Sequence, residues 1–257
     1  MSNRASHTNL VKQTIFYIFL LLLWEFIVAL KIWPEYMFPS PISVGKTLLF
    51  GFSDHSFMIG IIISLKRLCL GYGISIIFGS ILGVLLFRYN TLNDLLGGLI
   101  LSLQTMPSIC WFPLALLWFG LSEWAIVFVV IAGSLFSITM TVNSSMRNMS
   151  PIILNVGKNF GAKKLKMLIW VMLPSVAPSL AIGFRQSWSF AWRSLMAGEL
   201  IFNSLGLGFL LNMGRELNDM SRVIAVMFII AAISIIFDRL IFGQVERAIK
   251  LRWGAIK

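Results

Sequence analysis

Three charged side chains lie within one apolar run and are the residues best placed for chemistry. Arg185, Arg193 and Glu199 all fall in the apolar segment 175–199. Each charge costs roughly 2.5–3.5 kcal/mol near the centre of a membrane helix, so each must face protein or water. Such residues either pair neighbouring helices or line a polar path, and arginine in a path favours small anions.

Helical spacing puts most of the polar and aromatic residues of this segment on one stripe. At 100° per residue, the stripe extends from about −60° to about +40° relative to Arg185, whereas Arg193 lies off it at about +80°. Arg185 and Glu199 are roughly 21 Å apart along the helix, too far to pair with each other. Two interpretations stay open: the stripe lines a translocation path, or Arg185 and Glu199 pair with adjacent helices. The stripe comprises Arg185, Trp188, Ser189, Trp192, Met196 and Glu199.

Other reactive residues do not indicate an enzyme. His7 and His55 have no second ligand at metal-binding spacing, and Cys69 and Cys110 lie in apolar runs typical of buried thiols. The sequence contains no His-Glu-x-x-His, no Gly-x-Ser-x-Gly and no paired intramembrane carboxylates. We therefore expect no catalytic residue, no metal site and no bound cofactor, and an intramembrane enzyme is the weakest alternative.

Residues 40–47, Ser-Pro-Ile-Ser-Val-Gly-Lys-Thr, end like a phosphate-binding loop. The first glycine of that motif is replaced by Ser40, and Pro39 and Pro41 crowd the site. The segment is therefore not expected to bind ATP. Energy for transport must come from a separate subunit or from an ion gradient.

Membrane helices must position these residues. The 257 residues are 58% hydrophobic and only 12% charged, whereas soluble domains carry about 25% charge. The net charge of +11 is spread along the chain, which indicates loops near anionic lipid rather than a nucleic-acid surface. We predict an all-α membrane protein with a single transmembrane domain over residues 1–257. Runs near the required length of about 20 residues occur at 13–31, 68–88, 95–119, 124–143, 175–199 and 223–243.

The distribution of basic residues predicts that both termini are cytoplasmic. With the amino end inside, 13 of the 21 Lys and Arg residues lie on the inner side and six on the outer side. This orientation makes segment 144–174 a cytoplasmic loop.

The third apolar run is interrupted. Gln104-Thr105-Met106-Pro107-Ser108 and then Pro113 break it, and proline frees carbonyls that neighbouring helices or a water-filled cavity must satisfy. The break is either a packing kink or part of a transport path. In the second case Gln104, Met106 and Pro107 are candidate path residues.

The segment from Asn155 to Pro174 is basic, amphipathic and too polar to span a membrane. It predicts a helix, a glycine turn and a second helix that docks into a groove on a soluble partner. The alternative is a basic loop that lies on the lipid headgroups.

The order of residues in this loop resembles the cytoplasmic EAA loop of permease subunits of bacterial ATP-binding-cassette (ABC) importers. That loop has a Glu-Ala-Ala triplet, three residues, glycine, nine residues, an aliphatic residue, one residue and then Leu-Pro. Gly161, Val171 and Leu173-Pro174 stand at these positions, and Asn155-Val156-Gly157 replaces the triplet. The resemblance implies that the loop contacts the ATPase through Asn155, Gly157, Gly161, Ala162, Lys163, Leu173 and Pro174.

Further blocks are similar to one branch, the permeases for taurine, aliphatic sulfonates, nitrate and bicarbonate, with pyrimidine-precursor relatives. They extend over most of the chain. The blocks are Phe38-Pro39-Ser40-Pro41, Ser64-Leu65-Lys66-Arg67, Leu103-Gln104-Thr105-Met106-Pro107, Trp111-Phe112-Pro113-Leu114, Leu117-Trp118-Phe119-Gly120, Ala191-Trp192, Gly198-Glu199, Gly206-Leu207-Gly208 and Arg252-Trp253.

This resemblance implies the type I importer (MetI-like) fold in a bacterial plasma (inner) membrane. The implied partners are a second permease copy, a cytoplasmic ABC ATPase dimer that holds ATP and Mg, and an extracytoplasmic substrate-binding protein. The expected cargo is a small, anionic solute. Two alternatives stay open: an ion-coupled secondary transporter, and an importer of a neutral pyrimidine-type vitamin precursor.

Overall fold

The computed structural model describes residues 2–252, and its side chains from residue 12 to 249 and at 251. Within these ranges all regular structure is helical. The elements are α1 (Ser2–Ala29), α2 (Pro41–Ser53), α3 (Ser56–Arg88), α4 (Asn90–Thr105), η1 (Ser108–Trp111), α5 (Phe112–Phe119), α6 (Glu123–Arg147), α7 (Pro151–Asn159), α8 (Lys164–Met167), η2 (Leu168–Met172), α9 (Leu173–Phe202), α10 (Leu207–Glu216), α11 (Met220–Phe237), η3 (Asp238–Phe242) and α12 (Gly243–Arg252).

Five helical stretches among the described residues are long and apolar enough to cross a membrane, and the bent pair formed by α4 with η1 and α5 adds a sixth. The predicted all-α membrane fold with about six spans is thereby confirmed. Two stretches join several elements: Lys164–Phe202 includes the π-helix η2, and Met220–Ile249 includes the π-helix η3.

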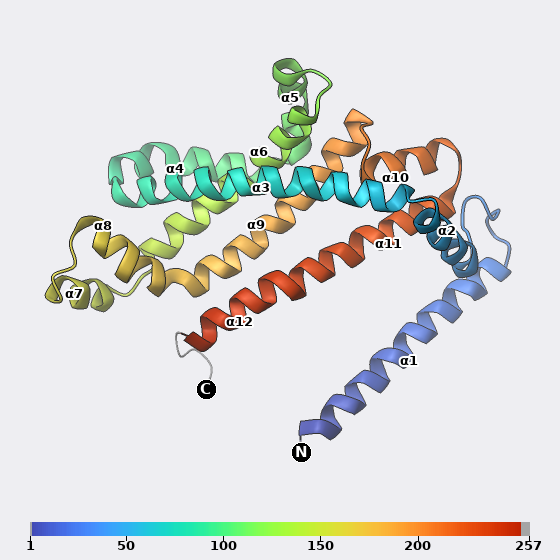
Figure 1. Cartoon of the computed structure of the whole chain (residues 1–257), viewed down its shortest axis with the longest axis horizontal. Helices are drawn as coiled ribbons and strands as arrows, with labels where there is room; N and C mark the ends of the chain where they lie inside the picture. Colours follow the sequence, from blue (N-terminus) through green and yellow to red (C-terminus); the bar gives the residue numbers. More distant parts are fainter. Residues whose placement is uncertain (1, 253–257) are drawn as a thin grey trace.

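Helices α1, α9 and α11–α12 slope in a similar direction, whereas α3 crosses them at an angle (Figure 1). The start of α1, the end of α12 and the α7–α8 segment lie toward one end of the molecule, whereas α2 and α10 lie toward the other. This arrangement agrees with a chain that crosses the membrane repeatedly and keeps its basic 144–174 segment on one side.

Helix α6 is the central helix. Its most apolar stretch is 61% buried, against 33% for α3 and 17% for the stretch containing α9. Glycines let α3 approach it closely, because a Cβ at Gly83 would lie 2.6 Å from Cβ of Val142. Small residues at such contacts are typical of membrane helices, which associate through packing rather than through the hydrophobic effect.

Hydroxyl groups reinforce this packing on both sides of α6. Ser134 of α6 donates a hydrogen bond to Oγ of Ser75 on α3 at 2.8 Å. On the opposite side, Ser187 of α9 donates to Oγ of Ser137 on α6 at 2.9 Å. All four serines are buried, so α3, α6 and α9 form one bonded unit.

The second span starts earlier than predicted. Helix α3 begins at Ser56 rather than at residue 68, so Lys66 and Arg67 lie inside a helix and not in an outer loop. The prediction was wrong because Arg67 is buried, with 3% of its surface exposed, and its charge is paired with carboxylates from other helices. A paired arginine does not end a membrane helix as an isolated one does.

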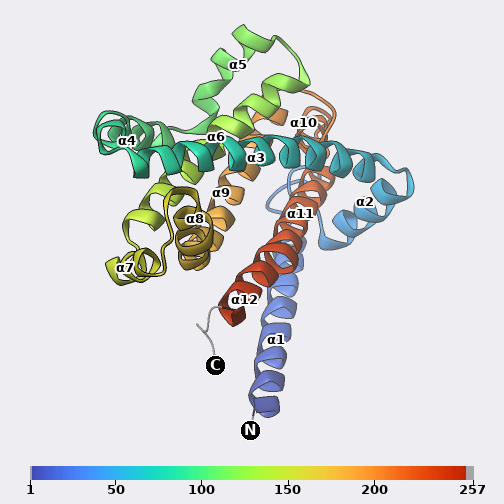
Figure 2. The same ribbon diagram turned by 60° about the vertical axis from the view of Figure 1, so that its left-hand side comes forward.

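The predicted break in the third span is confirmed at Met106-Pro107. These residues have extended backbones with ψ of 129° and 132°, and α4 is bent by 105° from the η1–α5 segment. The residue before a proline avoids the helical conformation, which explains where α4 ends. Figure 2 shows α4 beside α3 and α5 turned away from both. Pro113, by contrast, lies in the first turn of α5, where a missing N–H costs nothing, so it breaks no helix.

The close approach of α3 and α6 predicts that one added methyl group destabilises the fold. A Cβ at Gly79 would lie 2.9 Å from the carbonyl oxygen of Leu135, whereas a Cβ at Gly73 on the same helix meets nothing within 4 Å. We expect Gly79→Ala to lower the free energy of unfolding by about 1–3 kcal/mol. Gly73→Ala is the matched control and should be neutral or slightly stabilising. Thermal unfolding of the purified protein in detergent measures both, and equal midpoints would contradict the packing.

Candidate translocation and coupling sites

Glu199 is fully buried in a polar network between α9 and α3. Ser64 donates a hydrogen bond to its carboxylate at 2.8 Å, and the backbone N–H of Gly208 donates at 2.9 Å. Nη1 of Arg67 lies 3.1 Å from Oε1 of the same carboxylate. The charge is thus fully compensated by side chains and backbone, as a buried carboxylate requires.

Arg67 extends this network to two further segments. Its Nη1 donates to the carbonyl of Leu205 at 2.7 Å, and its Nη2 donates to Oγ of Ser204 at 2.9 Å. Nη2 also lies 3.1 Å from Oε1 of Glu123 at the start of α6. We call these contacts the Arg67–Glu199 network. It joins α3, α6, α9 and the α9–α10 turn at one end of the molecule.

Two glycines make room for the network. A Cβ at Gly206 would lie 2.5 Å from Oε1 of Glu199, and a Cβ at Gly208 would lie 2.5 Å from its Cβ. The space that Glu199 occupies therefore explains the two glycines of the Gly206-Leu207-Gly208 block. For Glu199, the geometry favours the helix-pairing interpretation over a place on an open path.

Arg185 also pairs with another span. Its guanidinium binds the carboxylate of Asp238 in η3, and Nη1 lies 3.3 Å from Oε2 of Glu246 in α12. These contacts connect α9 to the last membrane-spanning stretch, Met220–Ile249. The Arg185 and Asp238 side chains are 43% and 39% exposed on the isolated chain, so the pair lies at the surface of the helix bundle and not in its core.

The predicted tryptophan stripe packs mainly against neighbouring helices. Trp188 stacks on Phe237 at a ring-centroid distance of 5.1 Å and meets Tyr72 edge to face at 5.1 Å. Trp192 is 6% exposed and belongs to the same buried core. Met196 is partly buried against that core, whereas Ser189 is exposed. The structure thus divides the stripe between core packing, ion pairing and a short exposed part.

A separate polar cavity lies where α4 breaks. It has a volume of about 320 Å³ and is enclosed by the end of α4, by η1 and by residues of α6 and α9. The structure brings together here the three predicted residues Gln104, Met106 and Pro107 with Arg193, not with Arg185. The other lining residues are Leu103, Thr105, Ser108, Ile109, Ala132, Gly133, Phe190 and Ser194. We call it the break cavity.

Among the described residues that line the break cavity, Arg193 alone is charged. Its Nε donates to the carbonyl of Ser189 at 3.2 Å, and its Cζ lies 4.7 Å from the ring centroid of Phe190. Within the described side chains, no carboxylate lies at salt-bridge distance from it. The cavity therefore presents an unbalanced positive charge. Beside it, Oε1 of Gln104 is buried and has no hydrogen-bond partner among the described residues.

Helical spacing alone could not assign Arg193 to this cavity, because the residue lies off the stripe that starts at Arg185. The grouping depends on the bend at Met106-Pro107, which places the end of α4 and η1 around the same cavity as Arg193 of α9. The sequence contained two separate signals, a proline break in one span and an arginine in another, but nothing that placed them together.

The 144–174 segment folds as predicted into two helices around a glycine turn. Gly161 has a φ of +76°, a left-handed conformation that other L-residues adopt at a cost. The turn is closed by two hydrogen bonds: the N–H of Gly161 donates to Lys158 O at 3.0 Å, and that of Ala162 donates to Gly157 O at 2.9 Å. We call α7, this turn and α8 the elbow.

Gly157, at the last position of the replaced triplet, allows α7 to pack on the helix that follows. A Cβ there would lie 2.9 Å from Sδ of Met167 and 3.0 Å from Cγ1 of Val171. Asn155 on the same helix is exposed, and Pro174 falls in the first turn of α9, directly after Leu173. The elbow is therefore held against the start of the long α9 stretch.

The outer face of the elbow and of the adjoining η2 is apolar. Phe160, Trp170 and Ile152 are 88%, 76% and 71% exposed, which is unusual for large apolar side chains in a polar segment. They border a groove of about 640 Å³ that also includes Ala162 and Pro174. Large exposed apolar residues around a groove are typical of a surface that binds another protein.

Comparison with known families decides the identity of the chain. The model of the family described as "Binding-protein-dependent transport system inner membrane component" matches residues 75–250. The chain belongs to this family. The permease is 35% identical over 179 residues to an ABC transporter permease protein of Methanocaldococcus jannaschii, covering 69% of this chain and 67% of that one.

Two further relatives have named cargoes. The permease is 25% identical over 224 residues to the taurine transport system permease protein TauC of Escherichia coli, covering 85% and 82% of the two chains. It is 27% identical over 181 residues to the bicarbonate transport system permease protein CmpB of Synechococcus elongatus, covering 70% and 65%. The chain is a permease subunit of an ABC importer, as the resemblance predicted, and the ion-coupled alternative is not supported.

The Arg67–Glu199 network predicts a strong dependence of stability on one arginine. Arg67→Met leaves the Glu199 carboxylate buried and without its cation, which typically costs about 3–5 kcal/mol. Glu123→Gln removes the other carboxylate on Arg67, which is 60% exposed, and should cost less than about 1 kcal/mol. The unfolding midpoints of the two purified variants in detergent test this. Equal, small shifts would show that the network contributes little.

Proposed function

We propose that this permease carries a small anionic solute through the bacterial plasma membrane, as one of two copies of the chain. A cytoplasmic ABC ATPase dimer would bind ATP and Mg and supply the energy, and an extracytoplasmic binding protein would deliver the solute. The chain itself would be non-catalytic and would bind no cofactor. Both termini and the elbow would lie on the cytoplasmic side.

The break cavity carries the proposal of an anionic cargo. Arg193 supplies a positive charge without a carboxylate partner among the described residues, and Gln104 adds an amide that can orient a polar solute. A guanidinium binds carboxylates, sulfonates and similar oxyanions through two N–H groups at once. The named cargoes of the relatives, taurine and bicarbonate, agree with this chemistry.

A neutral cargo is the second candidate, because one relative is the formylaminopyrimidine transport permease protein ThiX of Halalkalibacterium halodurans, 27% identical over 226 residues. A pyrimidine could stack on an aromatic ring and use the Gln104 amide. The unpaired charge of Arg193 favours an anion over this alternative, since a neutral solute leaves that charge uncompensated.

For the path itself, we propose Gln104, Met106, Pro107 and Arg193 as its lining, with Ser189 exposed on the same face of α9. The extended backbone at Met106-Pro107 supports this role, because non-helical backbone at membrane depth is tolerated where it borders a cavity. Arg185, Trp188, Trp192, Met196 and Glu199 would then hold α9 in place rather than touch the solute.

Coupling to the ATPase would act through the elbow. Phe160 and Trp170 offer an apolar contact surface, and the elbow continues through η2 directly into α9, which lines the break cavity. Closure of the ATPase dimer on ATP would favour one arrangement of the spans over the other, so the cavity would open to alternate sides.

Removal of the cavity charge should impair transport without disturbing assembly. In proteoliposomes that contain the complete complex, we expect Arg193→Gln to reduce uptake of taurine or bicarbonate, whichever wild type transports, by about tenfold or more. Arg193→Lys keeps the charge and should retain a larger share of the activity. ATPase copurification should be unchanged in both variants. Unchanged uptake by Arg193→Gln would exclude Arg193 from the path.

The elbow turn should be sensitive to backbone conformation rather than to size. Gly161 has open space around it but a left-handed backbone, so Gly161→Val is strained whereas Gly161→Asn is tolerated. We expect the valine variant to lose ATPase copurification and uptake, and the asparagine variant to keep most of both. If the valine variant binds and pumps normally, the elbow is not the coupling element.

A further inference from the structure

A second cavity lies on the inner side of the elbow, apart from both the break cavity and the groove at Phe160. It has a volume of about 770 Å³ and is bounded by the end of α3, by α7 and by α8 with η2. Its size is in the range of sites that hold small molecules. Four of its 12 lining residues are basic and the others are apolar. The basic residues are Arg88, Lys158, Lys163 and Lys164.

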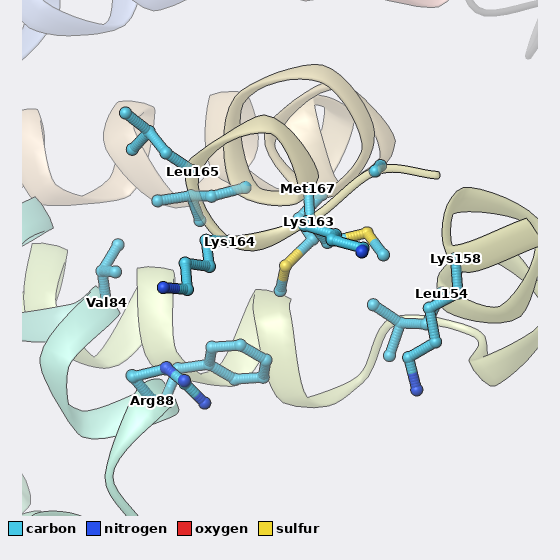
Figure 3. A pocket seen from close by; sticks show the side chains of 12 residues that line it. Val84, Arg88, Leu154, Lys158, Lys163, Lys164, Leu165 and Met167 are labelled. Carbon is cyan, nitrogen blue, oxygen red and sulfur yellow. The ribbon is translucent and has the colours of Figure 1, made fainter. Parts of the chain in front are cut away.

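The charges surround the cavity from several elements. In Figure 3, the side-chain nitrogens of Arg88 and Lys164 lie toward one end, and that of Lys158 lies toward the other. None of the described residues that line the cavity is acidic. Because its described lining residues include basic but no acidic side chains, the cavity is strongly complementary to an anion. Lys164 also has a φ of +46°, a conformation that a residue with a Cβ adopts rarely.

The walls between the bases suit a hydrocarbon chain. Val84 and Phe87 of α3 contribute to the lining, and Leu154 of α7 with Leu165 and Met167 of α8 completes much of the apolar wall. Figure 3 shows Val84 and Leu154 at different ends of the cavity. Val84 lies about one turn before the end of a membrane-spanning helix, Phe87 is its penultimate residue and Arg88 its last. The cavity thus combines apolar walls with basic groups at the depth where a membrane helix meets the aqueous phase.

We propose that this cavity binds an anionic phospholipid of the cytoplasmic leaflet, with its phosphate between Arg88 and Lys164 and an acyl chain along Val84 and Phe87. Basic pockets between membrane helices on the cytoplasmic side bind such headgroups. The inference rests on the proposed orientation of the elbow. A bound lipid would connect the end of α3 to α8, so it would brace the element that contacts the ATPase.

The test uses the purified full-length chain and three probes: phosphatidylglycerol, zwitterionic phosphatidylcholine and inorganic phosphate. Native mass spectrometry measures the lipid retained by wild type and by the double variant Arg88→Gln/Lys164→Gln. The matched control is Lys12→Gln/Lys166→Gln, which removes the same charge, since neither Lys12 nor Lys166 lines the cavity. A third variant, Val84→Phe, reduces the apolar volume and keeps every charge.

We expect wild type to retain phosphatidylglycerol but not phosphatidylcholine. The Arg88/Lys164 variant should bind it on the order of 10- to 30-fold more weakly, and the control should bind it like wild type. Val84→Phe should also weaken retention, and inorganic phosphate at millimolar concentration should not displace the lipid.

Three results would overturn the proposal. Equal losses in the test and control variants would mean attraction to a basic surface without a defined site. Displacement by inorganic phosphate alone would identify a soluble anion as the ligand. Retention that drops only when the ATPase is added would mean that a segment of the ATPase fills the cavity. Copurification of the ATPase with each variant tests the proposed coupling separately. A loss of lipid retention with unchanged copurification concerns this cavity alone, whereas a loss of copurification concerns the coupling.

Discussion

A charge in a bilayer must be paired or hydrated, and the fold of this permease satisfies that constraint mainly through Arg67. Its guanidinium meets carboxylates from α9 and from the start of α6, together with a carbonyl and a hydroxyl of the α9–α10 turn. Through one side chain, four segments are fixed at the same end of the molecule. Glycine is then required at 206 and 208, because the Glu199 carboxylate occupies the space of a side chain at 206, and Cβ of Glu199 with the nearby backbone occupies it at 208.

Local patterns were sufficient for the membrane spans and the elbow, but they did not predict the short helices α2 and α10. Apolar runs predicted the membrane helices, Met106-Pro107 predicted the break, and the glycine turn predicted the elbow, since each depends on residues close together in the chain. The start of α3 could not be predicted in this way. Lys66 and Arg67 resemble the end of a span until their partners are known, and Glu199 lies 132 residues away from Arg67.

The same limit applies to the cavities. A helical projection compares residues on one helix, so it grouped Arg185 with Glu199 and left Arg193 aside. The other residues that line the break cavity with Arg193 come largely from the end of α4, η1 and α6, and the 105° bend brings these segments together. A Glu-Ala-Ala triplet would place an acidic residue and two alanines at positions 155–157. In this chain Gly157 stands at the last of these positions and allows α7 to approach Met167 and Val171. That substitution concerns helix packing, which sequence spacing does not describe.

The continuity of the stretch from Lys164 to Phe202 has a mechanical consequence. The stretch carries the elbow at one end and is tied to α3 by Glu199 near the other. Between these points Ser187 binds it to α6 and Arg185 binds it to the last membrane-spanning stretch. A helix held at three places along its length does not tilt alone. A displacement of the elbow that reaches Arg193 must therefore carry the neighbouring spans with it, so these helices would move as one body beside the solute.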